Sequence, residues 1–335
     1  MKVLFDHPLP FWLAHGGMQI QIEQTRAALE SIGVEVEPVH WWDIAQRGDL
    51  IHFFERPSPH YVHLAKTKGI KIVFSCLHSS MGSRSRFKLW VQKALTRLTK
   101  RAMPTMILRI GWESYRNADA CIVLTPWEAH LVKFIFDAPP EKVHIIPNGI
   151  EDVFFAAPGK PRGQWLITTA TILPVKRIVE TAEAAVRAKT PYWVIGKPFT
   201  EDSPYYQTFL NLVRAHPGLL RYDGPVTDRA QLAGIYREAR GFVMLSKWES
   251  LSLSALEAAA AGCPLLLSDL PWAHSVFGDH VSYCPTRRFM SDAPPALRQF
   301  YDEAPQLPPP PKPQNWRDVA QQLKALYESL LNTSR

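Results

Sequence analysis

Short apolar runs alternate with helical patterns along almost the whole chain, and this alternation limits the possible folds more than any other feature. Such alternation predicts βαβ units, which build a mainly parallel sheet covered by helices. In the first half we expect strands at residues 3–5, 34–39, 50–54, 71–77, 120–124 and 143–146. The helices expected there are residues 18–32, 84–101, 106–117 and 126–136.

The second half repeats the scheme, so the sequence predicts an α/β protein of two domains. Its expected strands are residues 165–170, 192–195, 220–222, 242–245 and 265–267, and its expected helices are residues 176–187, 205–216, 228–239 and 254–261. Proline and glycine at 156–161 break both patterns, which divides the chain into domains at 1–157 and 158–315. A proline-rich spacer at 308–313 precedes a last helix within 316–335, which either crosses back to the first domain or packs locally.

Length and composition exclude several classes of protein. A chain of 335 residues suits two domains of ordinary size, and 46% hydrophobic residues is a globular composition. No apolar run reaches the roughly eighteen residues of a membrane span, and the first residues become polar too soon for a signal peptide. The four scattered cysteines (Cys76, Cys121, Cys263 and Cys284) indicate reduced thiols in a cytoplasmic protein, not a disulfide framework or a zinc site.

The positive charge of the chain is concentrated in one segment. Between His78 and Trp112 there are no acidic residues and eight basic ones, whereas the formal net charge of the whole chain is +7. On a helical wheel of residues 84–101, one side is apolar (Phe87, Trp90, Val91, Ala94, Leu95 and Leu98) and the opposite flank is basic (Arg86, Lys93, Arg97 and Lys100). This pattern predicts docking on an anionic membrane surface. The alternative is that the apolar side packs on the first domain.

The segment Glu249 to Pro264 is the most informative one for function. Two carboxylates, Glu249 and Glu257, stand eight residues apart, and the second lies in an alanine-rich helix that Gly262 and Pro264 end. Buried strands are expected on both sides, so the loop and helix belong to a parallel α/β unit, where ligands bind at the carboxyl ends of strands. The free N–H groups and dipole of the helix N-terminus attract phosphate. We therefore expect a phosphate and a hydroxyl-rich group here.

These residues resemble the signature of the retaining glycosyltransferases of family four, which have the GT-B fold of two Rossmann-like domains with a cleft between them. Further motifs follow in the family's order: Gly16-Gly17, residues 118–125, the Pro147-Asn148-Gly149 signature, and residues 171–177. Several ordered motifs over nearly the whole chain are a specific signal, whereas each alone would be weak.

The resemblance implies roles for residues of the second domain. Glu257 accepts hydrogen bonds from a ribose, Glu249 faces the donor sugar, and the backbone near Leu253 and Ser254 reaches the diphosphate. A cation beside the departing diphosphate lowers the barrier, and Lys176 fits the family's lysine. Thr171 stands where the family has an arginine, which puts part of this clamp in doubt. The replacements considered are Arg177 and Lys247.

The resemblance also implies a donor contact from the first domain. Gly16 and Gly17 permit close approach of a phosphate or sugar, and His78, at the end of an expected strand, touches the donor sugar. His7 and His15 are weaker candidates for acceptor contacts. The sequence contains no Asp-x-Asp pair, and with the resemblance this predicts a reaction without a metal or other cofactor.

The expected function is a retaining, metal-independent glycosyltransferase with a nucleotide-sugar donor, most simply a UDP- or GDP-sugar. The acceptor is a glycan, a lipid-linked or a small molecule, and the enzyme works in the cytoplasm or at the inner face of its membrane, in cell-envelope glycan synthesis. Two alternatives stay open: a sugar-nucleotide epimerase or hydrolase of the same fold, and a catalytically weak donor-binding scaffold, which Thr171 motivates. Nucleic acid is a poor partner because the chain is close to neutral outside the basic segment.

Overall fold

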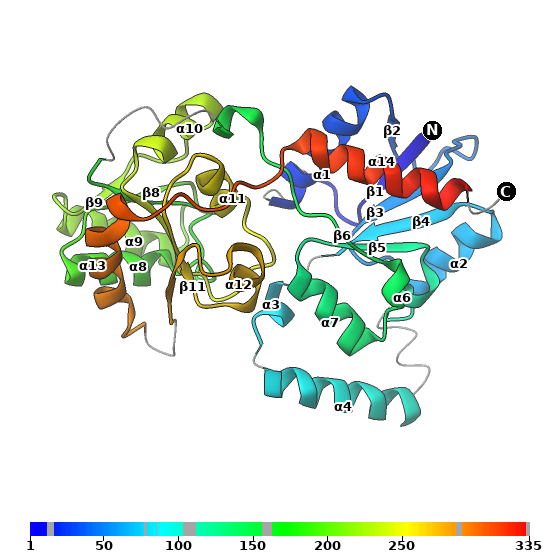
Figure 1. Cartoon of the computed structure of the whole chain (residues 1–335), viewed down its shortest axis with the longest axis horizontal. Coiled ribbons are helices and arrows are strands. Elements are labelled where there is room, and N and C mark those ends of the chain that lie inside the picture. The colour runs from blue at the N-terminus through cyan, green and yellow to red at the C-terminus, as the bar shows by residue number, and fades with distance from the viewer. Residues whose placement is uncertain are drawn as a thin grey trace. The chain divides into compact units, whose positions relative to one another are not determined.

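The chain forms two compact units, shown in Figure 1. The computed structural model describes residues 1–11, 17–76, 79–84, 86–102, 112–155, 163–285 and 290–332. The first unit comprises Met1–Gly149 together with Gln314–Arg335, and the second comprises Ile150–Pro313. Each unit has its own six-stranded sheet, in which every pairing of strands is parallel. The predicted boundary at residue 157 lies outside the described residues.

The sheet of the first unit has the strand order β2-β1-β3-β4-β5-β6. Its strands are β1 (Lys2–Asp6), β2 (Glu35–Pro38), β3 (Leu50–Phe54), β4 (Lys71–Ser75), β5 (Ala120–Val123) and β6 (Val143–Ile145). The central strands are buried along nearly their whole length, as expected for a parallel sheet covered on both faces. The chain passes from β1 to β2 on one side and then to β3 on the other, so the topological switch point lies between β1 and β3.

Helices cover this sheet. They are α1 (Gly17–Ser31), α2 (Pro59–Thr67), α3 (Ser79–Gly82), α4 (Arg86–Ala102), α6 (Ser114–Asn117), α7 (Pro126–Phe136) and α14 (Trp316–Asn332), with the 3-10 turn η1 at Pro140–Lys142. The start of α7 shows why the sequence forms a helix there. The N-cap Thr125 hydroxyl accepts a hydrogen bond from the Glu128 backbone N–H, and the Glu128 carboxylate accepts one from the N–H of Leu124, the residue before the N-cap.

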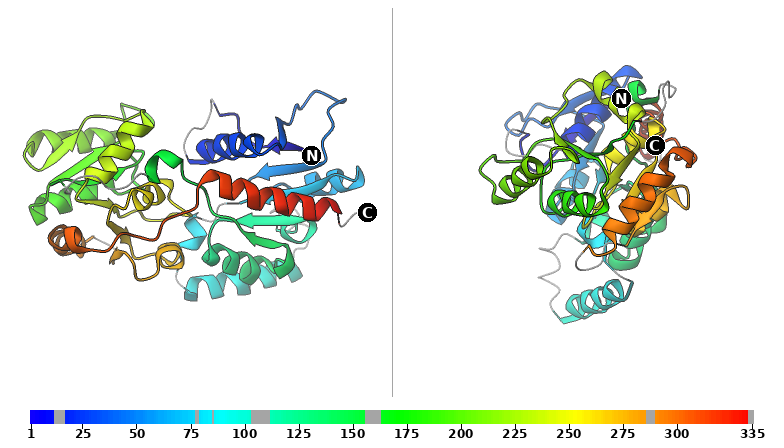
Figure 2. Two further views of the ribbon diagram at one scale, coloured as in Figure 1. Left: turned by 45° about the horizontal axis from the view of Figure 1, so that its top comes forward. Right: turned by 90° about the vertical axis from the view of Figure 1, so that its left-hand side faces the viewer.

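The last helix, α14, belongs to the first unit and packs against α1. The views in Figures 1 and 2 show it lying along the sheet of that unit. Its Tyr327 hydroxyl lies 2.7 Å from Nδ1 of the buried His52 on β3. At the N-terminal end of α14, Gly149 permits the close approach of the Trp316 backbone, because a Cβ on Gly149 would lie 2.5 Å from Trp316 Cα. Of the two arrangements considered from the sequence, the structure has the one in which the helix returns.

The sheet of the second unit has the order β12-β11-β10-β7-β8-β9. Its strands are β7 (Leu166–Thr169), β8 (Tyr192–Ile195), β9 (Leu220–Tyr222), β10 (Gly241–Met244), β11 (Leu265–Ser268) and β12 (Ser282–Cys284). Its helices are α8 (Ile178–Ala188), α9 (Pro204–Ala215), α10 (Arg229–Glu238), α11 (Leu253–Ala260), α12 (Pro271–Phe277) and α13 (Ala293–Glu303), with 3-10 turns η2 (Asp152–Phe155) and η3 (Ala304–Gln306). The strand order reverses between β7 and β10, which is the Rossmann arrangement.

Every expected strand is present, with bounds that shift by at most two residues where they can be compared. The expected helices are present too, although only the last turn of the one at 106–117, α6, lies in the described residues. The elements α2, α3, α12, α13 and β12 were not predicted from the sequence. Three of these helices, α2, α12 and α13, carry proline in their first turn, where its fixed φ suits a helix start.

Among the helices of the described ranges, none is both long and apolar enough to cross a membrane. The four cysteines are free thiols.

Candidate functional site

The candidate site lies at the switch point of the second sheet, where the segments after β7 and β10 run side by side. The Lys247 N–H donates a hydrogen bond of 2.8 Å to the Val175 carbonyl, which joins the two segments. This pairing brings the Lys176 ammonium into an ion pair with the Glu249 carboxylate, and both side chains are largely buried. A cation and a carboxylate thus stand together at the carboxyl edge of the sheet, where α/β proteins bind ligands.

The loop after β10 ends at the N-terminus of α11. Ser252 is the N-cap: its hydroxyl accepts a hydrogen bond of 3.3 Å from Ala255 N–H and lies 3.1 Å from the Ser254 hydroxyl. The N–H groups of Leu253 and Ser254 occupy the first helical positions, which have no partner within a helix. Together with the helix dipole they form a site suited to an anion.

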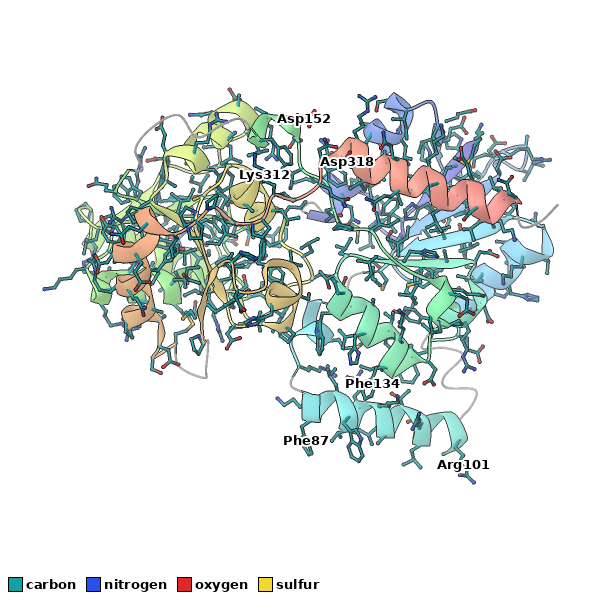
Figure 3. The ribbon with its side chains drawn as sticks, in the orientation of Figure 1. Phe87, Arg101, Phe134, Asp152, Lys312 and Asp318 are labelled. Atoms are coloured by element: carbon teal, nitrogen blue, oxygen red, sulfur yellow. The ribbon has the colours of Figure 1, made fainter. Side chains whose placement is uncertain are left out.

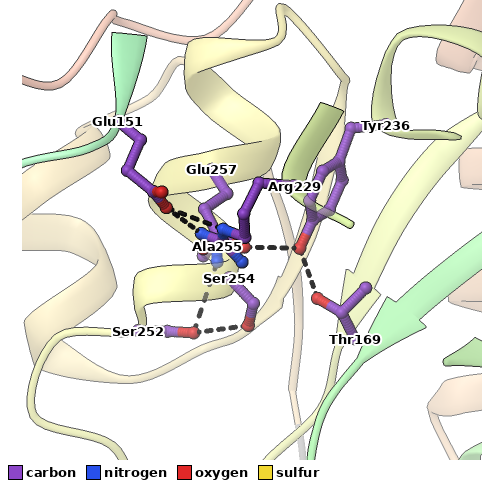
Figure 4. A network of polar contacts seen from close by, with 8 residues as sticks. All are labelled: Glu151, Thr169, Arg229, Tyr236, Ser252, Ser254, Ala255 and Glu257. Atoms are coloured by element: carbon purple, nitrogen blue, oxygen red, sulfur yellow. Dashed lines mark hydrogen bonds and ion pairs between the residues drawn. The ribbon is translucent and has the colours of Figure 1, made fainter. Parts of the chain in front are cut away.

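Glu257, one turn into α11, is the centre of a buried polar network drawn in Figure 4. One Arg229 nitrogen, Nη2, lies 2.5 Å from Glu257 Oε1 and 2.5 Å from Glu151 Oε2. The Tyr236 hydroxyl donates to Glu257 Oε2 over 3.1 Å and also forms a hydrogen bond with the Thr169 hydroxyl at the end of β7. The Glu257 residue is only 7% exposed.

The N-terminus of α10 places Arg229 in this network. Asp228 caps the helix by accepting hydrogen bonds from Ala230 N–H (2.8 Å) and Gln231 N–H (3.2 Å), so Arg229 is the first helical residue. Its guanidinium also lies over the Phe154 ring, 4.7 Å from the centroid. Stacking on the ring and two carboxylates hold it in one orientation.

Burial and charge act in opposite directions on Glu257. Burial raises the pKa of the carboxyl above its ordinary value, whereas the Arg229 charge and the hydrogen bonds from Arg229 and Tyr236 lower it. Burial also raises the pKa of Tyr236 far above its ordinary value, so the phenol stays protonated and donates to Glu257. A carboxylate has about four acceptor positions, so Glu257 can still accept hydrogen bonds from the hydroxyls of a ligand.

Lys247 and Arg177 are the other side chains predicted to contact the donor. Lys247 is exposed on the loop before Glu249. Arg177 precedes α8 in the left-handed region, with φ 52°, and its Nη1 lies 3.4 Å from Met290 Sδ. Burial lowers the pKa of this guanidinium. The replacement of the family's arginine by Arg177 stays a prediction.

The residues predicted in the first unit are described only in part. Gly17 begins α1 and is exposed, with open space around the position of a Cβ. Gly16, His15 and His78 lie outside the described residues, so their roles stay predictions. His7 is partly buried after β1, and its Nδ1 lies 2.7 Å from the Leu9 carbonyl oxygen.

Sequence reasoning missed Arg229, Tyr236 and Glu151. For Arg229 a signal existed, because a cation in the first turn of a helix is mildly unfavourable against the dipole. Tyr236 carried no such signal, since a tyrosine on the inner face of a helix is usually a core residue.

In the portion of the chain that the structure covers, no three His, Cys, Asp or Glu side chains are grouped so that they could hold a metal ion. Beside its carboxylates, the switch point holds the Lys176 ammonium and the backbone N–H donors at the start of α11, which suit an anionic group of a ligand.

Comparison with known proteins finds glycosyltransferases. The model of Glycosyltransferase Family 4 matches residues 37–153, and the model of Glycosyl transferases group 1 matches residues 170–288, so together they cover more than half of the chain. A D-inositol 3-phosphate glycosyltransferase from Jonesia denitrificans is 28% identical over 188 residues, which are 48% of this chain and 43% of the relative. The chain thus matches less than half the length of this curated relative.

Solved structures match over the whole chain. Sucrose-phosphate synthase from Thermosynechococcus elongatus superimposes with a TM-score of 0.68 at 16% identity, covering 99% of this chain and 100% of that one. HepE from Anabaena, solved with UDP and glucose, gives 0.64 at 12% identity, covering 98% and 99%. At this identity the likeness shows the fold, which is the GT-B fold of two Rossmann-like domains. With the two family models matching in order along the chain, the chain belongs to glycosyltransferase family 4.

Proposed function

We propose that this enzyme transfers a sugar from a nucleotide-diphosphate sugar, with retention of anomeric configuration and without a metal ion, to a glycan, lipid-linked or small-molecule acceptor. One observation carries the proposal. A lysine–carboxylate pair, a helix N-terminus and a buried carboxylate stand at the switch point of one sheet, within the segments that follow β7 and β10. The structure of HepE with UDP and glucose supports a UDP-type donor for this chain.

Each part of the donor finds a matching group. The diphosphate binds at the N-terminus of α11, near the N–H groups of Leu253 and Ser254, because the dipole and free donors favour negative charge there. The ribose hydroxyls donate to Glu257, which Arg229 and Tyr236 hold in place. Glu249 accepts a hydrogen bond from a hydroxyl of the sugar.

Lys176 has the electrostatic role. When the bond between the sugar and the diphosphate breaks, negative charge grows on the leaving phosphate, and a fixed cation beside it stabilises the transition state more than the ground state. In the free enzyme the Lys176 ammonium is paired with Glu249, so its charge is neutralised until a diphosphate competes for it. Attack on the same face that the phosphate leaves gives retention, and the leaving phosphate takes the proton of the acceptor hydroxyl.

The test is turnover of the variants Lys176→Met and Glu257→Gln with a panel of UDP- and GDP-sugars. Each is expected to lower kcat/KM by about 10²-fold, the size of a lost transition-state contact. The matched controls Lys189→Gln and Glu183→Gln remove exposed charges of the same kinds from α8 and its C-cap and should leave the rate unchanged. Near-normal rates in both site variants would contradict the assignment. Free sugar formed without any acceptor would instead favour a hydrolase of the same fold.

We also propose that α4 docks the enzyme on the inner face of an anionic membrane, beside an acceptor of the cell envelope. The helix packs on α7 through its other side: Leu89 and Thr96 are buried, and the Lys93 ammonium lies 4.0 Å from the centroid of the Phe134 ring. The apolar side of the predicted wheel faces solvent, with Phe87 74%, Trp90 63% and Leu98 64% exposed. Figure 3 shows Phe87 and Arg101 directed away from Phe134.

This arrangement supports a membrane surface as the partner. Large apolar side chains in a row on one exposed helix are uncommon in a protein that meets only water. The exposed Lys88, Arg97 and Arg101 flank the row, and each basic residue near an anionic surface contributes on the order of 1 kcal/mol. Lys93 is occupied by the Phe134 ring and contributes less.

Co-sedimentation with vesicles tests the docking proposal. We expect binding to phosphatidylglycerol vesicles but not to phosphatidylcholine vesicles, weakened by salt because the attraction is screened. Changing Phe87, Trp90 and Leu98 together to Ser should abolish binding, whereas the control Trp42→Ser, which changes an exposed tryptophan outside α4, should not. Equal sedimentation with both kinds of vesicle, or with neither, would contradict the proposal.

A further inference from the structure

The first unit contains a cavity of about 770 Å³ at its own topological switch point. The residues that line it follow β1 and β2, end β3, or lie on the facing side of α1. Phe5, Ile22 and Phe54 form its inner wall. Ligands of open α/β sheets bind at the carboxyl ends of strands where the strand order reverses, and a cavity of this volume holds a ligand of ordinary small-molecule size.

The chemistry of this cavity is mainly apolar and aromatic. Trp41 and Trp42 lie at its edge on the segment after β2 and are 71% and 94% exposed, so they contribute little to folding. Two neighbouring tryptophans left in water beside an apolar cavity offer a ligand flat faces on which to stack.

Charged groups at the cavity do not favour an ionic ligand. Glu23 and Arg26 on α1 have opposite signs, and each has a partner on its own helix: Gln19 donates to Glu23 over 2.8 Å, and Arg26 forms an ion pair of 2.8 Å with Glu30. Their charges offset each other, which leaves the Asp6 carboxylate as the further charged side chain among the lining residues that the structure describes.

One buried polar group in the cavity can orient a ligand. Asp6 ends β1, lines the cavity and is 5% exposed. Its carboxylate accepts hydrogen bonds from the Tyr61 hydroxyl, over 2.6 Å, and from the His7 N–H, over 2.8 Å. Because a carboxylate has about four acceptor positions, Asp6 can still accept a hydrogen bond from a ligand hydroxyl.

We propose that this cavity binds an amphiphilic acceptor, with its apolar body against Phe5, Trp41 and Trp42 and a hydroxyl directed at Asp6. The inference names the class of acceptor for the proposed sugar transfer and rests on that proposed function. A plain oligosaccharide is not the class that this lining selects, because its many hydroxyls would meet few polar partners and would lose their hydration.

The test uses octyl β-D-glucoside, below the concentration at which it forms micelles, and methyl β-D-glucoside as the matched ligand without the apolar chain. Isothermal titration calorimetry of the full chain should show saturable binding of the octyl glycoside at least 10-fold tighter than that of the methyl glycoside. Equal affinity of the two, or tighter binding of maltose, would overturn the proposal.

Variants locate the binding. Changing Trp41 and Trp42 together to Ala should weaken binding of the octyl glycoside about 10-fold. The single variant Trp42→Phe should keep most of the affinity, because an aromatic ring remains at that position. Asp6→Asn, which still accepts from Tyr61 but lacks the charge, should weaken it about 5-fold. Trp90→Ala is the control for binding to the apolar side of α4 and should change nothing; if it weakens binding as much as the pair, the cavity is not the site.

A second measurement distinguishes failure of the cavity proposal from failure of the proposed donor site. Thermal stabilisation by UDP is measured on the same samples, since a ligand that binds only the folded state raises its melting temperature. If UDP gives no shift while the octyl glycoside binds, the donor assignment fails and the cavity proposal stands. A shift with UDP in a protein that does not prefer the octyl glycoside leads to the reverse conclusion.

Discussion

The buried pair of Arg229 and Glu257 predicts a stability that depends on pH in a specific way. The perturbation is Arg229→Met, which keeps most of the side-chain volume and removes the charge. In the wild type, burial raises the pKa of Glu257 and Arg229 opposes that rise. Without Arg229 the carboxyl keeps Tyr236 as a hydrogen-bond donor but loses its counter-ion, and the nearby Glu151 carboxylate adds repulsion. The pKa of Glu257 in the folded state therefore rises further.

The sign of the effect follows from proton linkage. Below the pKa of the unfolded chain, Glu257 is protonated in both states and contributes nothing; above the folded-state pKa it is ionised in both, and the full penalty of the buried charge is present. Stability from this group thus falls as pH rises from about 4.5 through the folded-state pKa. In the variant, the loss of stability with rising pH is larger and continues to a higher pH.

The magnitude can be bounded from the geometry. Removing one partner of a fully buried pair costs about 3–5 kcal/mol. The Arg229 side chain is 35% exposed, so water already screens part of the interaction, and about 2 kcal/mol at pH 8 is a fair value. At pH 5, where the raised pKa of Glu257 favours the protonated form and relieves the penalty, we expect a smaller loss of about 1 kcal/mol, the contribution of lost stacking on Phe154.

Urea unfolding followed by circular dichroism at pH 5 and pH 8 measures both values. The double variant Arg229→Met with Glu257→Gln should recover most of the stability lost at pH 8, since no buried charge is then left unpaired. Arg214→Met, which removes an exposed arginine on α9, is the control and should cost little at either pH. Equal destabilisation at the two pH values, or a double variant no better than the single one, would refute the reasoning.

Three further predictions concern catalysis and packing. Activity should survive excess EDTA, because Lys176 and the N-terminus of α11 supply the positive charge; a loss restored by Mg²⁺ or Mn²⁺ would count against this. Proton NMR of early product should show the anomeric configuration of the donor, and an inverted product would refute retention. Gly149→Ala should lower the free energy of unfolding by about 2 kcal/mol or more, because its Cβ would meet Trp316 at 2.5 Å. The control Gly234→Ala, with open space inside α10, should be neutral or stabilising.

Most of the fold was predictable because the local sequence pattern of most elements agrees with their place in the sheet. Buried parallel strands such as β3 and β10 are continuous apolar runs, and an amphipathic helix follows most of them, so local pattern and tertiary position agree. The elements that were missed are short or begin with proline. α12 begins at Pro271 and has only seven residues, too few for a helical period to stand out against the surrounding loop.

The site was predictable only where its residues lie in ordered motifs. Glu249 and Glu257 lie on one loop and helix, and the pairing of Lys176 with Glu249 follows from the parallel strands β7 and β10. Arg229 and Glu151 are separated by 78 residues, and their meeting depends on how α10 and η2 pack, which no local pattern encodes. Such a network is a product of tertiary structure alone.

For α4 the sequence left a choice that only packing could make. A helical wheel separates an apolar side from a basic flank but does not say which of them touches the protein. In the structure Leu89 and Thr96 form the packed side, and the Lys93 ammonium lies over the Phe134 ring. If folding alone had shaped this helix, the exposed positions of Phe87, Trp90 and Leu98 would carry polar residues at no loss of core packing. Their apolar character is the observation on which the membrane-docking proposal rests, and the basic residues beside them favour an anionic surface as the proposed partner.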